Sequence, residues 1–220
     1  MVDDELGGDS VKIERLVLGM VSTNCYLISN EETKEAICFD PADNADRILE
    51  VLKEKGLTLK GILLTHGHFD HISAAEELRK KTKVLLYAME AERQLLTSPE
   101  INLSFTFLGH PVIVNADEYL QDGQEITLAS FKIKAIHTPG HTAGGCCYYF
   151  EKEGVLVSGD TLFCRTIGRT DFPTGSYGTL VDSIKNKLFV LPDETIVLPG
   201  HEDDTTIGYE KKYNNEIKDK

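Results

Sequence analysis

Short apolar runs alternate with amphipathic stretches along the chain, and the two patterns predict different elements. The apolar runs predict β-strands at 11–18, 25–29, 35–39, 61–64, 84–87, 125–128, 131–136, 146–150, 155–158 and 195–198. The amphipathic stretches predict helices at 44–55, 72–81, 89–96, 178–188 and 205–218. Early strands follow one another as meanders and later strands alternate with helices. This order predicts an α+β protein whose sheets are covered by helices on their outer faces.

Length and composition agree with a substantial core. The chain has 220 residues, of which 41% are hydrophobic, and no shift in composition or linker divides it. We therefore expect a single domain over residues 1–220.

Four metal-capable side chains follow the predicted strand at 61–64, within the run 65–71. They are His66, His68, Asp70 and His71. A solvated loop or an accident of helix capping would explain one histidine, but four nitrogen and oxygen donors in six residues favour a site for zinc or a similar ion. Four donors this close cannot all bind one ion comfortably, so the run predicts two neighbouring ions.

Three further donors stand in a similar setting downstream, each after an apolar run and directly after a glycine. They are His141, Asp160 and His201. Glycine permits a sharp backbone turn, which would bring each donor to a strand edge. Taken singly, each is equally well explained as an ordinary polar turn residue. Together with the first cluster, the three predict the remaining ligands of the two ions.

The order His-x-His-x-Asp-His, His, Asp, His resembles the metallo-beta-lactamase superfamily over nearly the whole chain. The resemblance implies an αββα sandwich of two mixed sheets with helices on the outer faces. It implies one ion held by His66, His68 and His141, and a second held by Asp70, His71 and His201, with Asp160 bridging. The ions would be zinc, although iron and manganese also suit these ligands. A hydroxide between the ions would attack a carbonyl, with Asp70 as the catalytic residue that orients it.

The segment 159–172 and the run around His201 resemble the glyoxalase II-like (hydroxyacylglutathione hydrolase-like) short bacterial branch. This implies a thioesterase for S-2-hydroxyacyl thioesters such as S-lactoylglutathione, and a thiolate leaves without help from a dedicated acid. Arg169 matches a basic residue near the substrate's anionic end, but an ion pair with Asp171 explains it equally well. We expect no C-terminal helical domain for glutathione, and Lys211, Lys212 and Tyr213 are not assigned to replace it.

Two other functions compete with thioester hydrolysis. Persulfide dioxygenases share the fold and the donor types, and would hold a single iron with His66, His141 and Asp160. A non-catalytic metal-binding protein is the third interpretation, and hydrolysis of a lactam ranks below it.

Charge and cysteine content limit the partners and the cellular location that we expect. The net charge of −13 argues against a nucleic-acid partner and against the nuclease branch of the superfamily. No apolar stretch approaches the roughly 18 residues of a membrane span, and Met1–Glu5 does not resemble a signal peptide. Five cysteines without a C-x-x-C pair fit a reduced, cytoplasmic protein. The sequence predicts a small-molecule acyl thioester substrate and leaves the oligomeric state open.

Several other residues are candidates for packing rather than chemistry. Cys146 and Cys147 are consecutive strand residues, so we expect them to be buried on opposite faces of a sheet. The apolar segment 101–115 would be a loop over the core or, as in relatives, a border of the substrate cleft. His110 and His137 are expected to be structural.

Overall fold

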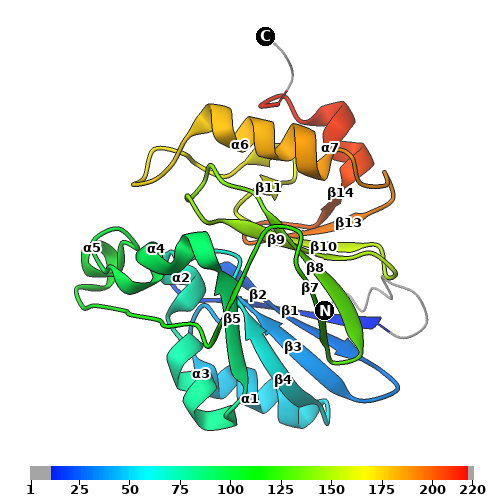
Figure 1. The fold of residues 1–220 in the computed structure, drawn as a ribbon. Helices are drawn as coiled ribbons and strands as arrows, with labels where there is room; N and C mark the ends of the chain where they lie inside the picture. The colour runs from blue at the N-terminus through cyan, green and yellow to red at the C-terminus, as the bar shows by residue number, and fades with distance from the viewer. Residues whose placement is uncertain (1–10, 218–220) are drawn as a thin grey trace.

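Two six-stranded mixed sheets pack face to face in a computed structural model that describes residues 11–217 (Figure 1). The first sheet has the order β1-β2-β3-β4-β5-β6 and the second the order β14-β13-β10-β9-β8-β7. The first contains β1 (Val11–Leu18), β2 (Thr23–Asn30), β3 (Glu35–Phe39), β4 (Thr58–Leu63), β5 (Leu85–Met89) and β6 (Glu118–Leu120). The second contains β7 (Glu125–Leu128), β8 (Phe131–His137), β9 (Cys146–Phe150), β10 (Val155–Gly159), β13 (Ile196–Pro199) and β14 (Thr205–Thr206). A small ribbon pairs β11 (Leu162–Phe163) with β12 (Thr166–Ile167).

Helices cover the outer face of each sheet, as the sequence predicts (Figure 1). On the first sheet lie α1 (Ala45–Glu54) and α3 (Ala75–Thr82). On the second lie α6 (Tyr177–Ser183), its π-helical continuation η2 (Ile184–Leu188) and α7 (Ile207–Tyr213). The short elements α2 (Phe69–Ile72), η1 (Glu90–Glu92), α4 (Arg93–Thr97) and α5 (Ser104–Leu108) complete the set. The αββα sandwich is confirmed.

The alternation of side chains along the strands produces three apolar layers. In β2, Cys25 and Leu27 face the helices on the outside, whereas Tyr26 and Ile28 face the second sheet. Because both faces of the central strands are buried, these strands read as continuous apolar runs. In α1, Ile48, Val51 and Leu52 supply the buried side, and the Asn44 side chain accepts a hydrogen bond from the Arg47 backbone N–H at the helix start.

The structure corrects several predicted boundaries. The predicted helix at 205–218 begins with strand β14, so helix α7 starts only at Ile207 and ends at Tyr213. The predicted strand at 61–64 begins at Thr58. The predicted helix at 89–96 is a 3₁₀ turn followed by α4. Residue 218, the predicted end of that helix, and residues Met1–Glu5 lie outside the described residues, and the single domain over 1–220 stays a prediction.

Candidate metal centre

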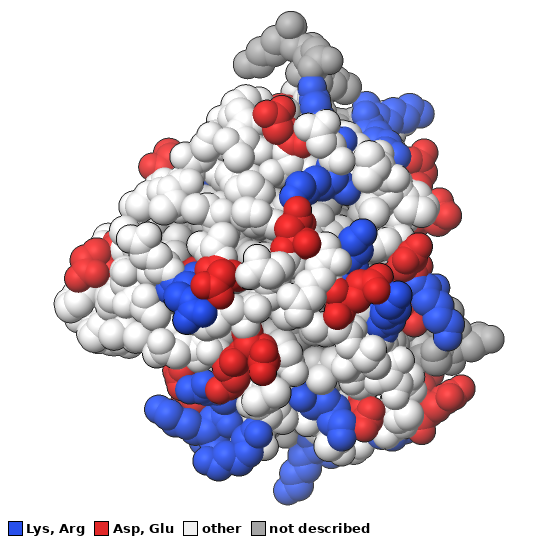
Figure 2. Space-filling model, viewed as in Figure 1, with Lys and Arg blue, Asp and Glu red and all other residues white. Residues whose placement is uncertain are grey.

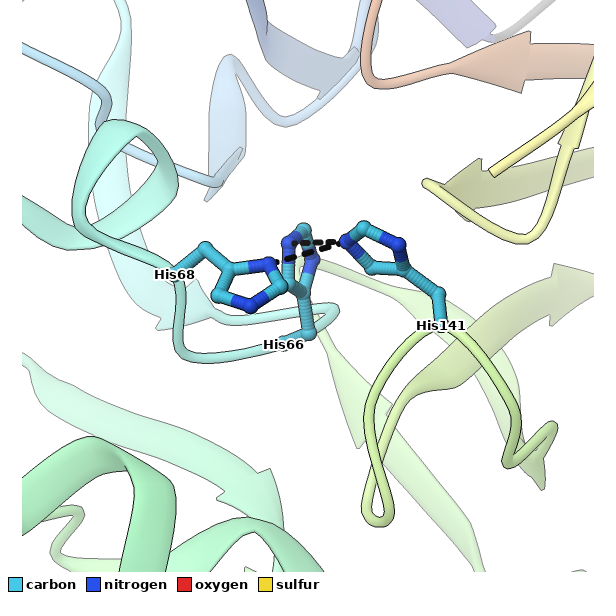
Figure 3. A group of neighbouring side chains, drawn as sticks. All are labelled: His66, His68 and His141. Atoms are coloured by element: carbon cyan, nitrogen blue, oxygen red, sulfur yellow. Dashed lines mark hydrogen bonds between the residues drawn. The ribbon is translucent and has the colours of Figure 1, made fainter. Parts of the chain in front are cut away.

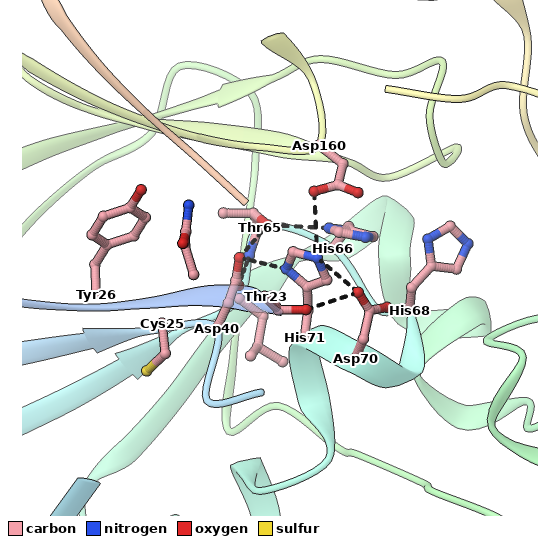
Figure 4. A network of polar contacts seen from close by, with 12 residues as sticks. Thr23, Cys25, Tyr26, Asp40, Thr65, His66, His68, Asp70, His71 and Asp160 are labelled. Carbon is pink, nitrogen blue, oxygen red and sulfur yellow. Dashed lines mark hydrogen bonds and ion pairs between the residues drawn. The ribbon is translucent and has the colours of Figure 1, made fainter. Parts of the chain in front are cut away.

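The structure brings all seven predicted donors together at one edge of the two facing sheets. Figure 4 shows five of them, His66, His68, Asp70, His71 and Asp160, with their polar neighbours. The first four come from the first sheet, at the end of β4 and on α2, and the other three come from loops that follow β8, β10 and β13. They are His66, His68, Asp70 and His71, then His141, Asp160 and His201. The ligand atoms fall into overlapping groups of three whose members lie within 4.8 Å of one another.

Three imidazoles form the first group (Figure 3). Nδ1 of His68 lies 2.9 Å from Nε2 of His141, which lies 3.3 Å from Nε2 of His66. All three side chains are buried. Burial lowers the pKa of each ring, and the pKa of His68 falls to about 3. Neutral imidazole is the form that binds a metal ion, so this group suits a divalent cation.

Asp70, His71 and His201 form the second group. Oδ2 of Asp70 lies 3.3 Å from Nε2 of His201 and 3.5 Å from Nε2 of His71. Burial lowers the pKa of His71, but the neighbouring carboxylates of Asp70, Asp160 and Asp40 outweigh burial and raise it well above its ordinary value. This group therefore pairs a carboxylate with two imidazoles whose pKa is raised, whereas the pKa of each ring in the first group is lowered.

Asp160 lies between the two groups. Its Oδ2 lies 3.5 Å from Nε2 of His141 in the first group and 3.6 Å from Nε2 of His201 in the second. Its Oδ1 lies 3.4 Å from Nε2 of His71, and neither of those two atoms has a hydrogen-bond partner among residues 11–217. Buried polar atoms without partners are costly, and a cation would satisfy them. The arrangement suits two divalent ions with Asp160 between them.

Sequence reasoning missed Asp40, which is not among the predicted donors but hydrogen-bonds to His71 and to Thr65. This buried carboxylate follows β3 and accepts hydrogen bonds from the Thr65 backbone N–H at 2.7 Å, the Thr65 hydroxyl at 2.6 Å and Nδ1 of His71 at 2.9 Å. The bond to Nδ1 turns Nε2 of His71 toward the other donors. The one sequence signal for Asp40 is its place directly after the predicted strand at 35–39, and the structure pairs that strand in parallel with β4, so that their carboxyl ends meet at the same sheet edge.

The outer nitrogens of two other rings are also fixed. Nδ1 of His66 lies 3.1 Å from the Thr65 hydroxyl, which donates to Asp40 and so accepts from the ring. Nδ1 of His141 donates to the Arg169 carbonyl oxygen at 2.7 Å. In both rings Nε2 is then left with its lone pair toward the centre.

Glu92, in η1, was also missed and joins the two loops that carry the first group of donors. Its carboxylate accepts 2.8 Å hydrogen bonds from the backbone N–H of Gly67, between His66 and His68, and of Gly144, in the His141 loop. Burial raises its pKa to about 7. A Cβ at Gly144 would lie 2.2 Å from the Glu92 backbone nitrogen, so glycine is required for this approach.

The glycines before the three downstream donors differ in their roles. Gly140 and Gly159 have φ values of +137° and +49°, which fits the predicted turns. Gly200 is outside the left-handed region. Its missing side chain instead leaves space, since a Cβ there would lie 2.2 Å from Oδ1 of Asp160 and 2.7 Å from Cε1 of His71.

Arg169 makes the ion pair that sequence analysis gave as the alternative to substrate binding. Its Nε and Nη2 donate to the two carboxylate oxygens of Asp171, both at 2.8 Å, and the pair is exposed. The guanidinium also lies over the Phe172 ring, 3.8 Å from its centroid. Contact with substrate stays a prediction.

The remaining candidates lie outside the donor cluster. All five cysteine thiols are free. Cys146 packs in the core between the sheets and Cys147 in the outer core of the second sheet, which confirms their burial on opposite faces. His137 bonds to the Ala143 carbonyl oxygen, and His110 lines a surface groove beside α3.

Comparison with known proteins identifies the family. Residues 18–201 match the metallo-beta-lactamase superfamily. The chain belongs to this superfamily. It is 36% identical over 205 residues to the probable metallo-hydrolase YqgX of Bacillus subtilis, covering 93% of this chain and 96% of that one. It is also 36% identical over 206 residues to hydroxyacylglutathione hydrolase GloC of Haemophilus influenzae, covering 93% of this chain and 97% of that one.

Solved structures of this superfamily share the fold. The crystal structure of BLEG-1 B3 metallo-beta-lactamase superposes with a TM-score of 0.89 at 40% identity, covering 94% of this chain and 99% of that one. TTHA1623 in a di-iron-bound form superposes with a TM-score of 0.81 at 30% identity, covering 92% and 98%. Membership of this superfamily, with this donor set, supports a metal-dependent hydrolase. In the described part of the chain, no helix is long and apolar enough to span a membrane.

Gly200→Ala is expected to weaken metal binding while leaving the protein folded. The new Cβ would push against Asp160 and His71, and changes next to metal ligands cost about 10- to 100-fold in metal affinity. Zinc affinity is measured by competition with a chromogenic chelator. The matched control is Gly178→Ala, because no atom lies within 4 Å of a Cβ at Gly178. Equal zinc affinities in the two variants would contradict this account of Gly200.

Proposed function

We propose that this protein is a dinuclear metal-dependent thioesterase that cleaves S-2-hydroxyacyl thioesters, such as S-lactoylglutathione. The similarity to hydroxyacylglutathione hydrolase GloC over nearly the full length of both chains supports this proposal. The observation that carries it is that the hydroxyl groups of Tyr26 and Tyr148 are already engaged as hydrogen-bond donors, which suits a leaving group that needs no protonation.

Two buried phenols donate to carbonyl oxygens close to the donor residues in sequence. The Tyr26 hydroxyl donates to the Pro199 carbonyl oxygen and the Tyr148 hydroxyl to the Leu64 carbonyl oxygen, both at 2.9 Å. Burial raises the pKa of both phenols. Neither is free to protonate a departing amine or alkoxide. A thiolate, whose conjugate acid has a pKa of about 8.5, leaves without such help.

The ligand assignment follows the two groups of donors. His66, His68 and His141 would hold one ion, Asp70, His71 and His201 the other, and Asp160 both. When bound, two such ions lower the pKa of water to about 7 and polarise a carbonyl. We propose zinc, which suits histidine and carboxylate ligands, while the di-iron form of TTHA1623 makes iron the main competitor.

We propose that Asp70 orients the attacking water. Its Oδ2 accepts a hydrogen bond from the Thr23 hydroxyl at 3.0 Å, which fixes the carboxylate. Burial raises the pKa of Asp70, but His71 and His201 outweigh burial and bring the pKa below its ordinary value. The Asp70 carboxylate is therefore a hydrogen-bond acceptor at neutral pH. By accepting a hydrogen bond from the water, it would direct the lone pair of the water oxygen at the carbonyl carbon.

Hydrolysis of a β-lactam is the second candidate, favoured by the 40% identity to BLEG-1 B3 metallo-beta-lactamase. A single-iron dioxygenase using His66, His141 and Asp160 is less well supported, because the second group of donors approaches Asp160 as closely as the first does. We also propose a cytoplasmic location, supported by five free cysteines.

Turnover by the zinc-loaded protein tests the proposed reaction. S-Lactoylglutathione hydrolysis, followed by release of free thiol, is expected to have a far higher kcat/KM than hydrolysis of a chromogenic cephalosporin. Equal or faster lactam cleavage would contradict the thioesterase. Oxygen uptake on glutathione persulfide by protein holding one iron, without thioester hydrolysis, would replace it with the dioxygenase.

Arg169→Ala is expected to raise KM for S-lactoylglutathione several-fold and to change kcat less, because an exposed guanidinium would bind an anionic group in ground and transition states alike. Asp171→Ala, which frees the guanidinium from its partner, is the matched variant and is expected to lower KM. Steady-state kinetics decide between the roles. Unchanged KM in both variants would leave Arg169 with a structural ion pair only.

A further inference from the structure

A row of aromatic rings leads away from the metal centre on the His68 side. The Phe172 ring lies 5.8 Å from the His68 ring and 6.4 Å from the Phe107 ring, measured between centroids. Phe107 stacks on Phe69 at 5.0 Å with an interplanar angle of 14°. We refer to Phe69, Phe107 and Phe172 as the aromatic cluster. It joins α2, α5 and the loop after β12, and it directly adjoins a predicted metal ligand.

The aromatic cluster is open to solvent on one side. Phe69 is buried beneath Phe107, Phe172 is half-buried, and Phe107 is 44% exposed. Figure 2 shows fewer charged side chains over the part of the surface around α5 and α6 than around α1 and α3. An apolar group that binds over exposed aromatic rings removes apolar surface from water, which favours binding. Because Phe107 belongs to the segment 101–115, this segment lies beside the centre. Its position agrees with the interpretation of the segment as a border of the substrate cleft.

Charges at the aromatic cluster are balanced. Arg169 lies over Phe172, and Asp171 neutralises it through two hydrogen bonds. This pair marks one end of the row, and the Phe69 and Phe107 rings form the other. An apolar substituent packed on Phe107 would gain ring contacts there, whereas a charged one would lose its hydration without meeting an opposite charge.

Resting on the proposed function, we infer that the aromatic cluster binds the acyl group of the substrate. The substrate is then a 2-hydroxyacyl thioester whose acyl group carries an aromatic or bulky apolar substituent. The acyl substituent is attached directly to the carbon next to the reacting carbonyl, and the cluster begins one ring away from the centre. A thiol that carries acyl groups in water is itself polar, so its long arm suits solvent better than the cluster.

The test compares two thioesters with the same carrier thiol. S-Mandeloylglutathione differs from S-lactoylglutathione in having phenyl where the latter has methyl. The wild-type protein is expected to show a higher kcat/KM for the phenyl compound. In Phe107→Ala the ratio of the two kcat/KM values is expected to fall by about two- to tenfold, the loss typical of one aromatic pair.

Phe105→Ala is the matched control, because Phe105 lies on the same helix, is 50% exposed and makes no ring contact in the described part of the chain. Its ratio is expected to equal that of the wild type. No preference for phenyl in the wild type, or equal ratios in the two variants, would overturn the inference.

Calorimetric binding of mandelate and lactate to the zinc-loaded protein separates this inference from the proposed function, because it needs no turnover. Tighter binding of mandelate that is lost in Phe107→Ala but kept in Phe105→Ala supports the aromatic cluster, even if neither thioester is hydrolysed. Thioester hydrolysis with equal binding of the two acids would overturn the cluster's role and leave the thioesterase intact.

Discussion

The face-to-face packing of the two sheets is the constraint on which the rest of the structure depends, because neither sheet alone carries a complete set of donors. Aromatic rings hold the sheets together, with Phe39 of the first sheet 5.6 Å from Tyr148 and 5.9 Å from Phe150 of the second. Direct hydrogen bonds then align the two edges. The Cys146 backbone N–H donates to the Thr65 carbonyl oxygen at 2.8 Å, one residue before His66. Small shifts between the sheets would therefore separate the donors.

Electrostatics divide the centre into unlike halves. The first group is built of buried imidazoles whose pKa is lowered, while the second sets the Asp70 carboxylate beside two imidazoles whose pKa neighbouring carboxylates raise, and Asp160 faces both. Asp40 and Glu92 are not among the predicted donors but stabilise this arrangement. Asp40 orients His71, and Glu92 joins the loops around Gly67 and Gly144. Outer groups of this kind fix ring orientation, which gives a metal site its geometry before any ion binds.

Much of this could be predicted from sequence, and the failures have physical reasons. Apolar runs located the long strands because most of these are buried, whereas β11, β12 and β14 are two residues each, too short to show a period. The donors stood out because four lie together in one run. Asp40 and Glu92 stand alone in the sequence, and only the pairing of distant strands and loops gives them partners. The aromatic cluster was hidden for the same reason.

We propose that this edge of the two sheets holds two metal ions, with Asp160 as a ligand of both. Native mass spectrometry of the protein, purified and then equilibrated with zinc, counts the ions bound to each chain most directly. Two ions are expected in the wild type, with loss of both or nearly both in Asp160→Ala. One ion in the wild type, or two ions retained in Asp160→Ala, would contradict it.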